Sequence, residues 1–94
     1  MSNYTRGRAR EYRIRKKLLK EGALWVVRSY GSHGLFDLTA VFPDCVRLIQ
    51  VKKRYIHPRE RRVLAEFAEK VKAGNISVEV WFTSPKLRVL RLGG

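Results

Sequence analysis

The sequence is poor in cysteine, in acidic residues and in long apolar runs, and each shortage excludes a class of protein. The single cysteine, Cys45, cannot form an intramolecular disulfide. His33 and His57 are isolated, so no group of cysteine and histidine has the spacing of a zinc site. No run reaches the roughly 18 apolar residues of a membrane-spanning helix, and the N-terminus lacks the apolar segment of a signal peptide. We therefore expect a cytoplasmic protein, whether nucleoid-associated or virus-encoded, with no membrane partner.

Basic residues dominate the composition. The 94 residues include 21 Lys and Arg against 8 Asp and Glu, which gives a formal net charge of +13. Hydrophobic residues make up 45% of the chain, enough for a folded protein, and the length predicts a single domain spanning residues 1–94. Such an excess of positive charge on one small domain favours a polyanionic partner, and nucleic acid is the leading one. A membrane surface is the weaker alternative.

Apolar periodicity and turn residues divide the chain into seven elements in the order α-β-β-β-α-β-β. Ile14 and Leu18 recur at helical spacing, and a short Pro-Asp break separates two apolar runs that read as a hairpin. We expect Trp25 and Trp81 to lie in the core, and we expect the two apolar C-terminal strands to carry a dimer surface. The predicted elements are a helix at 8–21, strands at 23–29, 35–42 and 46–51, a helix from 58 to a stop at 74–75, and strands at 76–83 and 87–92.

Glu11 is the only acid in a strongly basic N-terminal segment. It precedes Ile14 by three residues and Leu18 by seven, so all three stand on one face of the predicted helix. That face is the apolar one, and we therefore expect Glu11 to point towards the sheet. The alternative is a solvated Glu11 that pairs with Arg15 one helical turn later.

Three polar side chains stand in the two apolar runs of the hairpin. Strand side chains alternate between faces, so Gln50 and Lys52 share one face, and antiparallel pairing brings Asp37 near both. Such groups are costly to bury unless they have partners. The alternative is structural: Asp37 caps a turn or pairs with Arg28, and the other two form an ordinary polar strand end that continues into an exposed basic run.

Three runs within residues 6–54 resemble archaeal Holliday-junction resolvases of the PD-(D/E)XK nuclease superfamily, namely RGRAREYRIRKKLLKEG, VVRSYGSHGLFDLTA and LIQVKK. That family has a basic helix with a glutamate, a VRS-x-GS loop, a Pro-Asp pair before the second strand and Glu-Val-Lys on the third. The chain departs from the pattern at Phe36, which replaces the proline, and at Gln50, which replaces the glutamate. The resemblance implies an α/β, restriction-endonuclease-like core with a central mixed sheet flanked by helices.

The resemblance also implies a site for Mg²⁺, which Mn²⁺ can replace. Asp37, Gln50 and the Val51 carbonyl are the implied metal ligands, and Glu11 binds the metal or orients its water. Gln50 offers a neutral oxygen, which is a poorer ligand for a hard cation than the carboxylate of the family pattern.

Two further residues complete the implied catalytic site at the phosphate. Lys52 stabilises charge as it develops at the scissile phosphate, and Ser32, in the glycine-rich loop, contacts that phosphate. With Glu11, Asp37 and Gln50 they make up the implied catalytic set. We assign DNA contacts to Arg6, Arg8, Arg10, Arg28, Ser32, Lys53 and Arg54.

The expected function is that of a magnesium-dependent endodeoxyribonuclease that cleaves branched DNA, Holliday junctions above all, in recombination and repair. Two symmetric nicks need two active sites, so we expect a homodimer. One alternative is a less selective nickase or flap-type nuclease of the same fold. Another is a DNA-binding relative that lost cleavage together with the glutamate.

Overall fold

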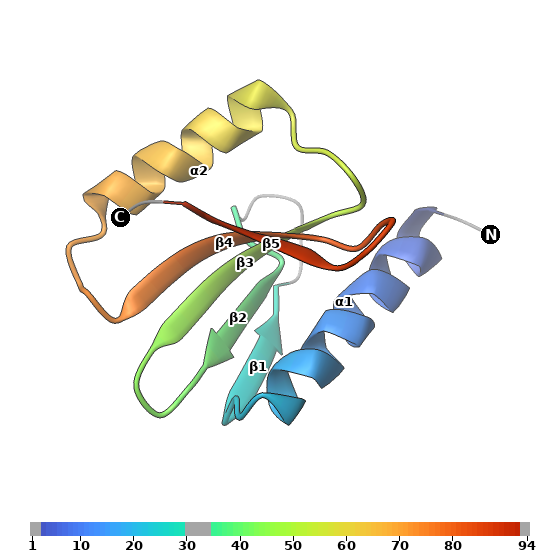
Figure 1. Cartoon of the computed structure of the whole chain (residues 1–94), viewed down its shortest axis with the longest axis horizontal. Helices are drawn as coiled ribbons and strands as arrows, with labels where there is room; N and C mark the ends of the chain where they lie inside the picture. Colours follow the sequence, from blue (N-terminus) through green and yellow to red (C-terminus); the bar gives the residue numbers. More distant parts are fainter. Residues whose placement is uncertain (1–2, 30–34, 93–94) are drawn as a thin grey trace.

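Five strands form one mixed sheet with a helix on each side of it (Figure 1). The structure, a computed structural model, describes residues 3–29 and 35–92, with side chains described from Ala9 onward. The α-β-β-β-α-β-β order and the mixed sheet are confirmed, and the element boundaries move by a few residues. In chain order the elements are α1 (Asn3–Lys20), β1 (Trp25–Arg28), β2 (Leu38–Val41), β3 (Val46–Lys52), α2 (Pro58–Lys70), β4 (Ile76–Phe82) and β5 (Arg88–Leu92).

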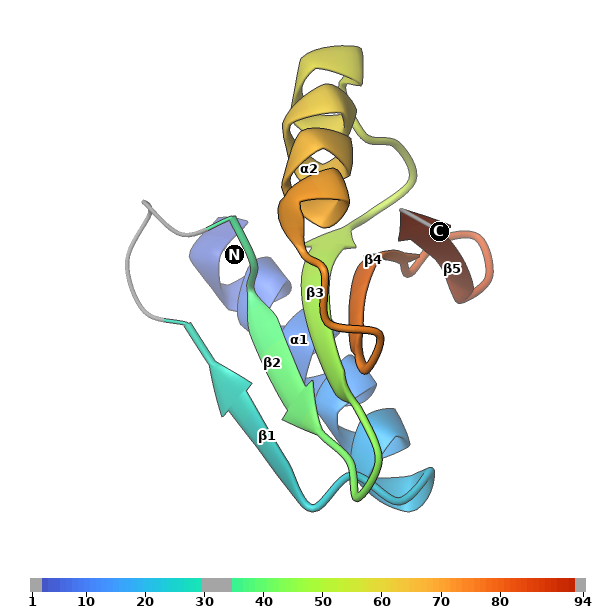
Figure 2. The same cartoon turned by 90° about the vertical axis from the view of Figure 1, so that its left-hand side faces the viewer.

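The strands lie in the sheet in the same order as in the sequence, β1 to β5 (Figure 2). β1, β2 and β3 form an antiparallel meander, and the β2–β3 register places Leu38 opposite Ile49. β3 and β4 are parallel, because α2 carries the chain back between them. β5 returns antiparallel along β4 and ends the sheet.

α1 covers one face of the sheet with the apolar stripe that the sequence predicts. Ile14 and Leu18 are fully buried, and they pack with Leu38, Ile49 and Trp81 in one core cluster. The helix starts five residues before the predicted start at residue 8. It ends just before Gly22, whose φ of 111° lies in the region that favours glycine.

α2 covers the opposite face. Leu64 packs there with Val78, Val80 and Phe82 in a second core cluster, because residues of even number on β4 face α2 while Trp81 faces α1. Pro58 occupies the first turn, and the side chain of His57 accepts a hydrogen bond from the Arg59 backbone N–H at 3.1 Å.

One expectation about an aromatic residue changes with the fold, and the dimer surface expected on the C-terminal strands stays a prediction. The prediction that Trp25 lies in the core is wrong, since it is 64% exposed at the start of β1, whereas Trp81 is buried as predicted. β4 lies between β3 and β5, so its apolar side chains are accounted for by the core of one chain. In the part of the chain that the structure describes, no helix is long and apolar enough to cross a membrane.

Candidate active site

Asp37 lies at the end of the β2–β3 ladder, immediately before β2. Its backbone N–H donates to the carbonyl of Ile49 at 2.8 Å, although Ile49 already stands opposite Leu38, so this bond is shifted by one residue from the register of the ladder. Its side chain then accepts from the Val51 backbone N–H at Oδ2, also at 2.8 Å. The carboxylate therefore takes the place of a strand carbonyl and lies in the plane of the sheet. The hairpin thus brings Asp37 directly to Val51, the residue between Gln50 and Lys52.

The carbonyl of Val51 lies on the same side of β3 as Asp37. In an antiparallel pair, the N–H and C=O of one residue both point to the same neighbouring strand. Val51 directs its N–H to Asp37, so its carbonyl faces that side as well. The next residue, Lys52, points its carbonyl towards the other neighbour, where it accepts from the Thr83 N–H at 3.1 Å.

Gln50 and Lys52 lie on the face of the sheet that α2 covers. Gln50 lines a hollow of about 320 Å³ together with the first turns of α2, including Glu60 and Leu64. Lys52 Nζ is 2.5 Å from Glu60 Oε2, and the side chains are 23% and 48% exposed. The lysine predicted to meet the phosphate therefore already has a carboxylate partner.

The Lys52–Glu60 pair was missing from the sequence analysis. Glu60 stands among arginines in the first turn of α2, where an acid is expected because it interacts favourably with the helix dipole. Because this helix-dipole effect alone accounts for an acid at that position, the sequence gives no indication that Glu60 contacts Lys52 of β3.

Glu11 points to the sheet and forms an ion pair with Arg28 of β1. Its side chain is 15% exposed and that of Arg28 is 27% exposed, so the expectation from helix spacing is confirmed and the solvated alternative with Arg15 is wrong. Arg28 is paired with Leu38 in the sheet, and the Ser29 N–H donates to the Asp37 carbonyl at 2.9 Å. Glu11 and Arg28 therefore lie on the α1 face close to the Asp37 backbone.

The remaining predicted DNA contacts fall into three groups. Lys53 and Arg54 are exposed directly after β3, where they are accessible to a phosphate backbone. Arg10 is half-buried on α1. Three predicted contacts, Ser32 and the side chains of Arg6 and Arg8, lie outside the residues and side chains that the structure describes.

A second acidic group, which the sequence analysis overlooked, is buried in β4. Glu79 is 0% exposed and faces α1 beside Trp81. It accepts hydrogen bonds from Ser77 Oγ at 2.6 Å and Trp81 Nε1 at 2.8 Å, and Arg47 and Arg91 lie within 3.8 Å and 3.5 Å of its Oε2. The available signal was the tryptophan two residues later, because Trp81 and Glu79 share a face and tryptophan rarely lines a solvated one.

The oxygen atoms at the β2–β3 end have the chemistry that a hard divalent cation requires. Asp37 supplies a carboxylate, Gln50 an amide oxygen and Val51 a carbonyl, and Mg²⁺ takes such oxygen ligands. A carboxylate accepts at several lone-pair positions, so the bond from Val51 leaves Asp37 further capacity. Among the described residues, no three His, Cys, Asp or Glu side chains gather as a metal-binding group. The predicted ligand set has only two carboxylates, Glu11 and Asp37, and takes its other oxygens from Gln50 and the Val51 backbone, so it would not form such a group of three.

Comparisons with known proteins do not assign the chain to a family. A scan against protein-family models finds no match, and a search of the curated proteins finds none either.

Proposed function

We propose that this chain is a magnesium-dependent endonuclease that cleaves branched DNA, with the fold of the PD-(D/E)XK nucleases. The observation that carries the proposal is the hydrogen bond from Val51 to Asp37, which unites the carboxylate with the Gln50–Lys52 segment. The α-β-β-β-α-β-β order, the mixed sheet and the net charge of +13 are consistent with it.

Asp37, Gln50 and the Val51 carbonyl would hold the Mg²⁺ ion, with Glu11 approaching from α1. When bound, the ion supplies a Lewis acid for the phosphate and lowers the pKa of its water. Asp37 contributes the negative charge that Gln50 lacks, so it is the principal ligand of the set.

Lys52 binds the scissile phosphate in this proposal and stabilises the charge that develops on it. In the DNA-free protein Lys52 is paired with Glu60, so phosphate binding competes with a carboxylate that is half exposed. The exchange has a small cost, because surface ion pairs contribute at most about 1 kcal/mol. Glu11 orients the attacking water, and Arg28 holds the glutamate against the sheet.

The direct test is cleavage of a synthetic four-way junction with Mg²⁺ or Mn²⁺, compared with a plain duplex of the same sequence. The proposal predicts metal-dependent cleavage that favours the junction. Paired symmetric nicks, together with sedimentation at twice the monomer mass, would support a homodimer with two active sites. Equal cleavage of both substrates would instead support the less selective nickase or flap-type enzyme, and cleavage of neither would contradict the proposal.

A DNA-binding protein without nuclease activity is the second candidate. Two observations favour it, namely the neutral Gln50 in the proposed ligand set and the lysine already paired with Glu60. Junction binding that survives while every metal concentration gives no cleavage would establish this candidate over the nuclease.

A further inference from the structure

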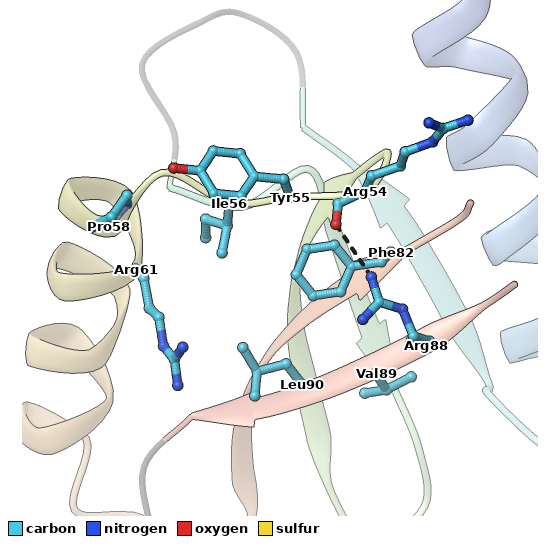
Figure 3. Close-up of a pocket in the computed structure, with 9 residues that line it drawn as sticks. All are labelled: Arg54, Tyr55, Ile56, Pro58, Arg61, Phe82, Arg88, Val89 and Leu90. Carbon is cyan, nitrogen blue, oxygen red and sulfur yellow. Dashed lines mark hydrogen bonds between the residues drawn. The ribbon is translucent and has the colours of Figure 1, made fainter. Parts of the chain in front are cut away.

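A second hollow, of about 570 Å³, lies between the start of α2, the end of β4 and the edge strand β5 (Figure 3). It is separate from the hollow that Gln50 lines. Its walls are nine residues from three segments that are distant in the sequence, namely Arg54, Tyr55, Ile56, Pro58, Arg61, Phe82, Arg88, Val89 and Leu90. A hollow of this size can hold one nucleotide.

The floor of this hollow is apolar and the rim carries an exposed aromatic ring. Ile56 and Phe82 are 8% and 7% exposed and belong to the core cluster under α2, so the floor is firmly packed. Tyr55 and Val89 stand at the rim and are 66% and 47% exposed. An exposed aromatic ring above an apolar floor offers a planar, uncharged group a surface on which to stack.

The charge lining the hollow is entirely positive. Its walls include three arginines and no acid. Arg88 is held in place, because its guanidinium lies 4.8 Å from the Phe82 ring centre and donates to the Arg54 carbonyl at 3.2 Å. Arg61 extends from α2 towards Leu90 across the opening, whereas the Arg54 side chain leads away from it (Figure 3). Arg61 and Arg88 are therefore the two guanidinium groups that an anion in the hollow would meet.

We propose that this hollow binds one unpaired nucleotide of a DNA strand, with its base against Tyr55 and the apolar floor and its phosphate between Arg61 and Arg88. A free phosphate would use the arginines and leave the apolar floor unused, whereas a nucleotide uses both. The choice of DNA as the source of the nucleotide rests on the proposed function.

The position of the hollow fits a strand that also reaches the candidate active site. Lys52 ends β3, and the hollow begins two residues later at Arg54. The first turns of α2 separate the two hollows, since Pro58 and Arg61 line this one while Arg59 and Glu60 line the one beside Gln50. A nucleotide next to a phosphate held at Lys52 can thus leave the stack and enter the second hollow, as unpaired bases at a branch point can.

The test is a titration of the whole chain, labelled with ¹⁵N, with a 5′-phosphorylated thymidine dinucleotide in the absence of divalent metal. Amide shifts should concentrate at Tyr55, Ile56, Val89 and Leu90. Inorganic phosphate should bind at least about ten-fold more weakly, because stacking of a base contributes about that factor or more.

Matched variants distinguish binding in the hollow from nonspecific attraction of the dinucleotide to the positive charge of the protein. Arg61→Gln should weaken dinucleotide binding about ten-fold, since it removes a charge-assisted hydrogen bond. Arg62→Gln removes the same charge from the next, exposed position of α2, which lines neither hollow, and should change the affinity less than two-fold. Tyr55→Ala should cost a factor similar to Arg61→Gln, and Tyr55→Phe should restore most of it because the ring remains.

Three outcomes would overturn the proposal. The first is amide shifts spread over α1 with none at the hollow, and the second is an equal loss of dinucleotide affinity for Arg61→Gln and Arg62→Gln. The third is amide shifts at the hollow that depend on protein concentration in the absence of dinucleotide, because they would assign the surface to a second copy of the chain.

The nuclease proposal can fail independently of the proposal about the hollow. If the protein does not cleave DNA but binds the dinucleotide at the hollow, only the nuclease proposal is contradicted. If it cleaves DNA but does not bind the dinucleotide at the hollow, only the inference about the hollow is contradicted.

Discussion

Lys52 and Glu60 illustrate how one contact between a strand and a helix can set the state of a candidate catalytic group. Lys52 Nζ lies 2.5 Å from the Glu60 carboxylate, so the positive charge of the lysine already has a negatively charged partner. A DNA phosphate must compete for the same ammonium group. Because Glu60 is 48% exposed, the pair is screened by solvent and opens at low cost.

Glu60→Gln should therefore raise the affinity for branched DNA about two- to five-fold, the range expected for one exposed ion pair. The variant releases Lys52 for one more phosphate contact, so the slope of log affinity against log salt should become steeper by about 0.9. Salt titrations of the parent and the variant measure both effects. Glu66→Gln removes an equal charge from an exposed position of α2 and serves as the control. If the two variants change the salt slope equally, Lys52 is not the group released.

Glu11→Gln should lower junction cleavage about 10²-fold or more, as for other positioned acid–base or ligand groups. Junction affinity should stay within about two-fold, because Glu11 is 15% exposed and faces the sheet. The substitution also removes the charge of one side of the Glu11–Arg28 ion pair, which should lower the free energy of unfolding by about 1–3 kcal/mol. Cleavage must therefore be measured where urea unfolding shows the variant to be fully folded. Parent-like cleavage under those conditions would leave Glu11 a purely structural role.

For individual residues, the sequence predicts where a side chain lies better than it predicts which side chain pairs with it. Helix spacing was sufficient to place Glu11 against the sheet, and strand alternation was sufficient to place Asp37 beside Gln50–Lys52, because both arguments use local geometry. The partners Arg28 and Glu60 come from other elements. Their selection depends on how α1 and α2 pack on the sheet, which no local pattern specifies.

Among the elements, β4 contains a buried charged residue whose need for polar partners is not evident from the sequence. Glu79 is the only charged residue of β4, and its carboxylate is completely buried with Ser77, Trp81 and two arginines around it. A buried carboxylate needs such partners, because desolvation without them costs several kcal/mol. The arginines come from β3 and β5, so Glu79 ties the three C-terminal strands together on the α1 face.

Glu79→Ala should lower the free energy of unfolding by about 1–3 kcal/mol, since it leaves the buried Trp81 indole N–H without its acceptor, whereas Arg47 keeps its ion pair with Glu21. Glu66→Ala, at an exposed position of α2, should change the same quantity by less than about 0.5 kcal/mol. Urea denaturation followed by tryptophan fluorescence measures both variants. Similar values for the two would show that the Glu79 contacts add nothing to stability.

The elements themselves were predictable, and the errors have a common cause. Period and turn residues located all seven elements because these signals are local. The core position predicted for Trp25 is wrong because an edge strand of four residues does not reveal in its sequence which face is covered, and in β1 Trp25 is exposed while Val26 is buried. In the sequence Glu79 has the pattern of a solvent-facing residue in an alternating strand, but α1 covers the face on which it lies.

For the molecule as a whole, the excess of positive charge would govern the proposed binding of DNA. With a net charge of +13 and exposed basic residues after β3, we expect roughly 5–9 phosphate contacts. Log affinity should then fall with log salt at a slope of about −4 to −8, since each contact releases counterions. A titration of junction binding between low and physiological salt measures it. A slope near zero would contradict any DNA-binding role for the chain.

We propose above all that Asp37, which accepts from Val51 beside Gln50 and Lys52, is the main ligand of a metal site for DNA cleavage. Two substitutions change its charge in opposite directions. Asp37→Asn keeps an oxygen that can accept the Val51 N–H, so the strand pairing survives while the carboxylate charge is lost. Gln50→Glu adds a carboxylate and should strengthen the binding of a hard cation.

The most direct measurement is the rate of junction cleavage against Mg²⁺ and Mn²⁺ concentration for the parent, Asp37→Asn and Gln50→Glu. We predict that Gln50→Glu reaches half-maximal cleavage at a lower metal concentration than the parent and that Asp37→Asn does not cleave. An inactive parent with an active Gln50→Glu variant would identify the natural chain as a DNA-binding protein that lost cleavage with its carboxylate. If Asp37→Asn cleaves as fast as the parent at every metal concentration, the proposed metal site is wrong.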